Sequence, residues 1–382
     1  MRPGDIYLDH NATTPLRPEV LALMQRCLAE QFGNASSLHS AGQAARAMVE
    51  RARQQVARGL ACPAEAVFFT SGGTEADNWA LTGVLGHRPG RLVTSAIEHH
   101  AVLHCARHLQ GQGHELVLVP PDRTGQVDPG AVAALLDEHT ALVSVMLANN
   151  ETGVLQPVAP IGQLARERGV LFHVDAVQGF GKVPVQVDEL GADLVSISAH
   201  KLNGPKGVGA LYVRPGTPLM PWTHGGGHEG GRRAGTENTA GIAGFGQAAE
   251  TALAVREQEA KRLAVLRDRL EQGLLAAVTG IQVNGAGAPR LPNTLNVSIA
   301  GVQAEALLLG LDLEGVMVSS GSACSAGGEE PSHVLLAMGV ERRLAGGSLR
   351  FSLGWGNTAE QIERVIEVLP GLVHRLRALA GN

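Results

Sequence analysis

Several features that mark common classes of protein are missing from this chain. It has four cysteines: Cys27, Cys62, Cys105 and Cys324. They form no C-x-x-C pair, which argues against a zinc ribbon or a dithiol redox site, and we predict no metal site. No apolar run reaches the roughly 20 residues that a membrane-spanning helix needs, and the amino terminus lacks the apolar core of a signal peptide.

Charge gives equally little support for a polyanionic partner. The net charge is −5 and no long basic block is present, so we expect neither a nucleic-acid nor a membrane partner. Widely spaced cysteines without an evident disulfide framework fit a reducing compartment. We therefore expect a cytoplasmic, unexported protein.

The pattern of apolar residues predicts an α/β protein with two domains. A length of 382 residues exceeds what one core holds, since single cores stop growing at roughly 250–300 residues. Strand-like runs alternate with helical ones and predict a mostly parallel, seven-stranded sheet covered by helices. The expected strands are 66–70, 91–95, 115–119, 141–148, 170–174, 194–198 and 209–213.

The remainder of the chain predicts helices at the start and a smaller domain at the end. Apolar spacing of three and four predicts helices over 16–31, 39–60 and 239–277. Strands are expected near 294–299, 316–319 and 348–352, with helices between and after them. We predict a large domain over 16–255 and a small α+β domain built from 1–15 and 256–382.

Lysine is scarce, and one lysine stands out by its position. The chain has four: Lys182, Lys201, Lys206 and Lys261. Lys201 follows the strand expected at 194–198, and Asp175 follows the one at 170–174, where open α/β sheets place their ligands. A lysine that forms a Schiff base and a carboxylate that faces a pyridinium nitrogen are the groups that pyridoxal 5'-phosphate (PLP) requires. The sequence therefore predicts a PLP enzyme. Lys206 is predicted to be a solvated turn residue, and Lys182 and Lys261 have less local support.

A glycine-rich turn offers a phosphate site. Gly72, Gly73 and Thr74 lie between a strand and a helical run, where backbone N–H groups and a hydroxyl can bind phosphate. An ordinary capped turn explains this segment equally well. Ser198 and His200, beside Lys201, could complete a phosphate site. No G-K-[ST] loop and no G-x-G-x-x-G motif at the first strand is present, which argues against nucleotide binding.

Two further strand ends carry candidate ligands. His99 follows the strand ending near residue 95, where an imidazole could stack on a flat ring and relay protons, although a lone histidine there is more often a helix cap or a surface group. Asn150 could bond a ring oxygen or a substrate carboxylate, although asparagine and glycine also build plain turns.

The carboxyl-terminal part supplies a candidate nucleophile and a candidate anion ligand. Cys324 lies in a run of small residues with no apolar period, and an exposed, flexible cysteine is costly unless its reactivity is used. The other three cysteines are predicted to be buried and inert. Arg350 lies inside a strand, where a bidentate contact to a substrate carboxylate or a structural salt bridge would account for it.

Taken together, these motifs resemble the cysteine desulfurases of the nitrogen-fixation and iron–sulfur-assembly type. The resemblance covers nearly the whole chain, from Tyr7-Leu-Asp-His-Asn-Ala-Thr-Thr14 and Gly33-Asn-Ala-Ser-Ser-Leu-His39 to Ser-Ala-His-Lys201, Arg233-Ala-Gly-Thr236 and the Cys324 segment. It implies PLP fold type I, the aspartate-aminotransferase-like fold. His10 and His228 depart from the commoner asparagine and glutamine of this family.

The resemblance also implies a role for each site residue. The implied catalytic residues are Lys201, Cys324 and His99. The implied cofactor-binding residues are Gly73, Thr74, His99, Asn150, Asp175, Gln178, Ser198, His200, Lys201 and Thr236, the last reaching the phosphate of the neighbouring subunit in a homodimer. The implied substrate ligands are Asn34, Asn150 and Arg350.

The implied activity is removal of sulfur from L-cysteine, which gives L-alanine and a persulfide on Cys324. A sulfur-acceptor protein such as an iron–sulfur scaffold would receive that sulfur for cofactor assembly. Two alternatives remain open. One is a selenocysteine lyase, or another PLP-dependent lyase or aminotransferase of the same fold, and the other is a non-catalytic PLP-binding partner in sulfur transfer.

Overall fold

A seven-stranded sheet forms the centre of the larger part of the molecule. A computed structural model describes residues 4–320 and 331–380. In spatial order the strands are β2 (Val67–Thr70), β8 (Gly209–Val213), β7 (Leu194–Ser198), β6 (Leu171–Asp175), β5 (Thr140–Ser144), β3 (Arg91–Ser95) and β4 (Glu115–Val119). Only β8 runs antiparallel to its neighbours, so the predicted mostly parallel α/β sheet is confirmed.

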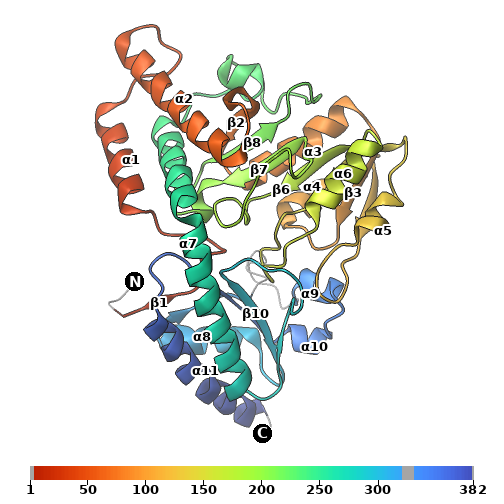
Figure 1. Cartoon of the computed structure of the whole chain (residues 1–382), viewed down its shortest axis with the longest axis vertical. Helices are drawn as coiled ribbons and strands as arrows, with labels where there is room; N and C mark the ends of the chain where they lie inside the picture. Colours follow the sequence, from red (N-terminus) through yellow and green to blue (C-terminus); the bar gives the residue numbers. More distant parts are fainter. Residues whose placement is uncertain (1–3, 321–330, 381–382) are drawn as a thin grey trace.

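Helices cover both faces of this sheet, which explains its continuous apolar strands (Figure 1). The helices are α1 (Pro18–Glu30), α2 (Ser40–Leu60), α3 (Gly73–His87), α4 (His100–Gly111), α5 (Pro129–Ala133) and α6 (Val158–Glu167). Successive residues of one strand serve opposite cores: Leu142 packs in the core of α3 and α4, and Val143 packs in the core of α2 and α6. Alternate side chains of the strand therefore pack against helices on opposite faces of the sheet.

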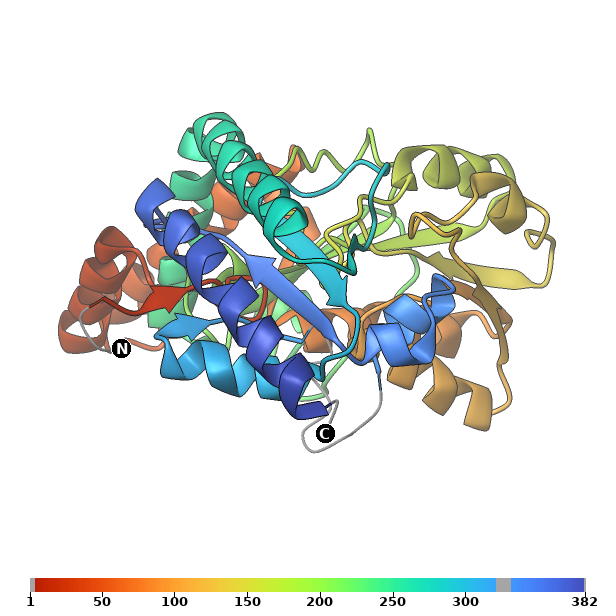
Figure 2. The ribbon, with the colours of Figure 1, turned by 90° about the horizontal axis from the view of Figure 1, so that it is seen from below.

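The smaller part has its own core. Its sheet is β9 (Ile281–Val283), β10 (Thr294–Ile299) and β12 (Ser348–Ser352), all antiparallel, and β1 (Ile6–Tyr7) pairs in parallel with β11 (Val316–Met317). Its helices are α8 (Ala304–Leu313), α9 (His333–Ala337), α10 (Arg342–Ala345) and α11 (Ala359–Ala380). Because β1 pairs with β11, the amino-terminal strand belongs to this smaller part, whose other strands come from the carboxyl-terminal third of the chain (Figure 2).

One long helix joins the two cores. Helix α7 (Thr239–Ala277) has 39 residues and runs through both parts, a length of about 58 Å at the usual rise per residue (Figure 1). Phe245 packs in the large core, and Leu270 packs in the small one. The boundary that we propose near residue 255 falls inside this helix. None of the helices in the described ranges is long and apolar enough to span a bilayer.

The structure differs from the sequence-based prediction at a few strand ends. Strand β5 stops at Ser144 rather than at Ala148, because the chain then turns and Ala148 forms only a bridge with Leu155. Strand β11 is two residues long, and the three-residue strand β9 was not predicted. Short edge strands carry too few alternating residues to show a period of two in the sequence.

A buried ion pair fixes the glycine-rich segment that follows β8. Arg53 on α2 and Glu229 form two hydrogen bonds, of 2.7 and 2.9 Å. Glu229 also accepts the backbone N–H of Phe69 at 2.8 Å, and Arg53 donates to the carbonyl of Val67 at 2.7 Å. These contacts hold Glu229 at a φ of 46°, a conformation that is unfavourable for a residue with a Cβ.

We expect Glu229→Ala to lower the free energy of unfolding by about 3 kcal/mol, because it leaves the Arg53 charge buried without its partner. The matched control is Glu363→Ala, which breaks an exposed pair with Arg269 and should cost below about 1 kcal/mol. Urea denaturation of both variants measures the difference. Equal losses in the two variants would show that the buried pair has no special role.

Candidate active site

One pocket lies at the edge of the large sheet where the parallel strands end. It encloses about 970 Å³, including its open mouth. The residues that line it are Asn11, Ala12, Gly73, Thr74, Asp77, His99, Met146, Ala148, Asn150, Asp175, Val177, Gln178, Ser198, His200, Lys201 and Arg350. Ten of the predicted site residues, from six separate segments, are among them. The carboxyl ends of β2, β3, β5, β6 and β7 bring these segments together, as open α/β sheets generally do.

The amino-terminal segment holds the candidate Schiff-base lysine. Lys201 ends a short 3₁₀ turn (Ala199–Lys201) directly after β7. Its Nζ donates to the carbonyl oxygens of Asn11 at 2.6 Å and Ala12 at 2.9 Å. The Asn11 carbonyl also accepts Nε2 of Gln178 at 2.9 Å. Lys201 and Gln178 therefore share one backbone acceptor, which sets their relative positions.

A buried carboxylate faces the pocket from the end of β6. Asp175 accepts the backbone N–H of Val177 at 2.9 Å. Burial raises the pKa of Asp175 to about 6, while the Val177 bond and the Lys201 charge act in the opposite direction. Burial and the nearby Asp175 also raise the pKa of Asp77, which lies in the same pocket. A buried carboxylate in this position fits a protonated ring nitrogen, because the cation would offset its desolvation.

The opposite end of the pocket suits a phosphate. Helix α3 begins at Gly73, where an added Cβ would lie 2.6 Å from Cγ2 of Val177, so only glycine fits against that wall. Ser198 Oγ is buried and has no hydrogen-bond partner among the described residues. Thr74 and His200 complete this end. An orphaned hydroxyl beside a helix N-terminus is what an absent anion would leave, and PLP therefore fits the pocket.

His99 is both a helix cap and a pocket residue. Its Nδ1 accepts the backbone N–H of Ala101 at 3.1 Å at the start of α4. Burial, followed by the Lys201 charge, lowers the pKa of His99 to about 4. An imidazole whose Nδ1 accepts a hydrogen bond carries its proton on Nε2 when neutral. The geometry thus presents a neutral ring at the pocket.

Arg350 lines the pocket and keeps one N–H group without a partner among the described residues. Its Nη2 lies 2.7 Å from Oδ1 of Asp9, and its Nη1 donates to the carbonyl of Asn150 at 3.0 Å. Its Nε is buried and has no partner in the described part of the chain. The structural salt bridge considered for Arg350 is therefore present, and one N–H group remains for a ligand such as a carboxylate.

Two predicted site residues lie elsewhere, and a third is not among the described residues. Asn34 and Thr236 are exposed and do not line the pocket of their own chain. Cys324 lies outside the described residues. Their roles stay predictions. On either side of residues 321–330, Ser319 pairs through its backbone with Arg350, which lines the pocket, and Nε2 of His333 lies 3.0 Å from the carbonyl of Glu98, the residue before His99.

Sequence reasoning missed three polar residues at this site. Asn11 and Asp77 line the pocket, and Lys182 contacts Gln178 from behind it. Asn11 lies within the motif at residues 7–14, and Asp77 lies three residues after Thr74, so their positions in the sequence could have identified them. Lys182 follows Gln178 by four residues, but no pattern in the sequence shows that its turn is buried.

Comparisons with known proteins agree over almost the whole chain. The aminotransferase class-V family model matches residues 6–365. A cysteine desulfurase IscS from Dictyoglomus turgidum is 46% identical over 379 residues, 98% of this chain and 96% of the relative. A solved NifS-like protein has a TM-score of 0.91 at 38% identity and covers 97% of this chain and 100% of its own. A structure described as SspA in complex with cysteine has a TM-score of 0.81 at 33% identity, covering 91% and 98%.

We expect His99 to remain neutral in the cofactor-free protein at every pH above about 5, with its proton on Nε2 and a titration midpoint near 4. Because the pKa is lowered on folding, the unfolded chain takes up this proton first, so the contribution of His99 to stability is lost as the pH falls from about 6.5 toward 4. Nitrogen-15 NMR of labelled histidine measures the tautomer and the midpoint, with His99→Asn to assign the signal. A midpoint near 6.5 would contradict the buried, neutral ring.

Proposed function

The chain belongs to the aminotransferase class-V family, and from that premise we propose that it is a PLP-dependent cysteine desulfurase. The observation that carries the proposal is the convergence of Lys201, Asp175 and His99 on one pocket whose other end suits a phosphate. Two relatives that are 46% and 45% identical are named cysteine desulfurase, which supports L-cysteine as the substrate. The structure described as SspA in complex with cysteine supports the same substrate.

The residues of the pocket divide the work of such a reaction. PLP, when bound, supplies an electron sink for bonds at the substrate α-carbon. Asp175 would hold the ring nitrogen in its protonated form, and Gln178 would donate to the ring hydroxyl. Thr74, Ser198 and His200 would bind the phosphate. Lys201 would hold the aldehyde carbon and move protons, and His99 would stack on the ring as a neutral imidazole.

Substrate binding and sulfur transfer are assigned to two other groups. Arg350 and Asn150 would hold the carboxylate of L-cysteine, which is supported by their place in the pocket wall and by the unpartnered Nε of Arg350. The Cys324 thiolate would attack the substrate sulfur, so that the carbon–sulfur bond breaks and the carbon product leaves as L-alanine once it has gained a proton. Cys324 then carries the sulfur as a persulfide. Ser319 and His333 lie on either side of the Cys324 segment and contact Arg350 and the carbonyl of Glu98, next to His99, which supports this role.

We further propose a cytoplasmic homodimer that passes sulfur to an acceptor protein, such as an iron–sulfur scaffold. Exposed apolar side chains at Phe32 and Leu38 flank Asn34, and Thr236 is exposed and separate from its own pocket. Such a surface supports pairing with a second copy, whose pocket Thr236 and Asn34 would complete. The thiols of Cys27, Cys62 and Cys105 are free, which supports a reducing compartment.

The purified protein with PLP and a thiol reductant should convert L-cysteine to L-alanine with an equal amount of sulfide. Cys324→Ala should keep its bound PLP and lose at least about 99% of alanine formation, since it removes the attacking thiolate. The matched control is Cys62→Ala, which removes a half-buried cysteine that does not line the pocket and should change the rate little.

Other results would point to the other functions. Alanine formation from L-selenocysteine that survives in Cys324→Ala would indicate a selenocysteine lyase. Bound PLP with no alanine from either substrate would leave an aminotransferase or a non-catalytic partner in sulfur transfer. Absence of PLP binding by the wild type would overturn the proposed function itself.

A further inference from the structure

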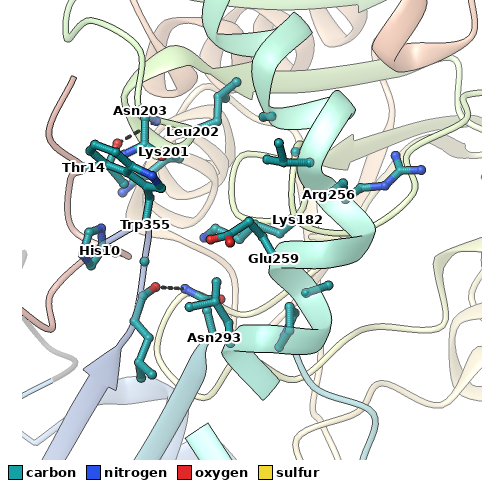
Figure 3. Close-up of a pocket in the computed structure, with 18 of the residues that line it drawn as sticks. His10, Thr14, Lys182, Lys201, Leu202, Asn203, Arg256, Glu259, Asn293 and Trp355 are labelled. Carbon is teal, nitrogen blue, oxygen red and sulfur yellow. Dashed lines mark hydrogen bonds between the residues drawn. The ribbon is translucent and has the colours of Figure 1, made fainter. Parts of the chain in front are cut away.

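A second cavity lies directly behind the candidate active site. Figure 3 shows it between the amino-terminal segment, helix α7 and the loop after β12, with Lys182, Glu259 and Trp355 facing it. The side chain of Lys201 lines both this cavity and the active-site pocket, so it forms part of the wall between them. We call this second space the rear cavity. Residues in its wall can act on the active site without touching a substrate.

Lys182 enters that wall and makes two short contacts. Its Nζ donates to Oε1 of Gln178 at 2.9 Å and to Oδ1 of Asn11 at 3.2 Å. Both acceptors are neutral amides that line the active-site pocket, while Lys182 itself does not line it. Glu259, the carboxylate in the wall of the rear cavity, forms an ion pair with Arg262. The contacts of Lys182 therefore point toward the active site rather than toward a salt bridge.

These contacts help to fix which way two amides face, together with the Asn11 carbonyl at Gln178 and the Asn150 carbonyl at Asn11. A lysine ammonium has only donors, so it must meet the oxygen of each amide. With Oε1 directed at Lys182, the Nε2 group of Gln178 is directed at the Asn11 carbonyl, 2.9 Å away, and one N–H of that group remains for the pocket. Lys182 and the Asn11 carbonyl favour the same orientation of the Gln178 amide. Without Lys182, only that carbonyl would oppose a half-turn, which would present an acceptor to the pocket instead of a donor.

Other positive charges lie near Lys182, which is unusual for a lysine in a turn. Burial, followed by the charges of Lys201 and Arg350, lowers the pKa of Lys182 to about 7. Lys182 in turn lowers the pKa of His10 and of His200, although burial is the larger cause at both. A partly buried amine among other cations is costly, so a hydrogen-bonding role offers a reason for its place.

From this geometry we propose that Lys182 is a positioning residue for the cofactor. By bonding the oxygens of Gln178 and Asn11, it orients the Gln178 amide so that an N–H group faces the ring hydroxyl of PLP. The inference rests on the proposed function, because it takes PLP as the ligand. Lys182 touches neither the cofactor nor the substrate and acts through Gln178.

The experiment measures cofactor binding rather than turnover. Lys182→Met keeps an unbranched apolar stem and removes the donor, and Gln178→Ala removes the amide. For each protein, titration of the cofactor-free form with PLP gives the dissociation constant and the absorption maximum of the bound cofactor. Lys261→Met is the matched control, since Lys261 is an exposed lysine on α7.

We expect Lys182→Met to raise the PLP dissociation constant by roughly tenfold, the factor that a lost hydrogen bond to a charged group typically produces, and to shift the absorption maximum. Lys182→Arg, which also only donates, should recover most of the wild-type affinity. In the Gln178→Ala background, Lys182→Met should add less than about twofold, because a residue that acts through Gln178 has nothing left to orient. Lys261→Met should match the wild type.

Three outcomes would overturn the inference. They are an unchanged dissociation constant and spectrum in Lys182→Met, full additivity of the two substitutions, and no recovery in a folded Lys182→Arg. If Lys182→Met does not fold, Lys182→Ala replaces it, since water from the adjoining cavity can fill the space of the lost stem. Failure of the wild type to bind PLP would instead reject the proposed function, so the two failures are distinguishable.

Discussion

Every polar group of Asn11 is hydrogen-bonded, and this one residue ties the active site together. Its carbonyl accepts Lys201 and Gln178, and its Oδ1 accepts Lys182 and Asn293. Its backbone N–H donates to Oγ of Ser352, and its Nδ2 donates to the carbonyl of Asn150 and to Oγ1 of Thr294. The partners belong to both parts of the molecule. A change in the relative position of the two cores would therefore move the acceptor that holds Lys201.

The pocket keeps several ionisable groups in unusual states by the same physical means. Burial raises the pKa of Asp175 and lowers those of His99 and His200. Each shift favours the neutral form, and the neighbouring charges modify it. A protonated ring beside Asp175 and an anionic phosphate beside His200 would move these two pKa values back toward the charged forms, because an opposite charge offsets the cost of burial.

Some of this site could be predicted from residues close together in the sequence. Lys201 and Asp175 each follow an apolar strand, and parallel strands bring their carboxyl ends to one edge, so the predicted convergence on one pocket agrees with the structure. The resemblance to cysteine desulfurases is confirmed by relatives and by solved structures. Lys182 could not be identified in this way, because its burial depends on α7 and the amino-terminal segment, which are remote in the sequence.

The sequence by itself determined the order of strands and helices, the placement of Lys201 and Asp175 at strand ends, and the glycine-rich start of α3. These features follow from local periodicity and from the steric demands of single residues. Only the tertiary structure decided that β1 joins the carboxyl-terminal part, that Asn11 holds Lys201, and that Arg350 both pairs with Asp9 and keeps a free donor. Such contacts join residues more than a hundred positions apart, and their geometry depends on how two cores pack along α7.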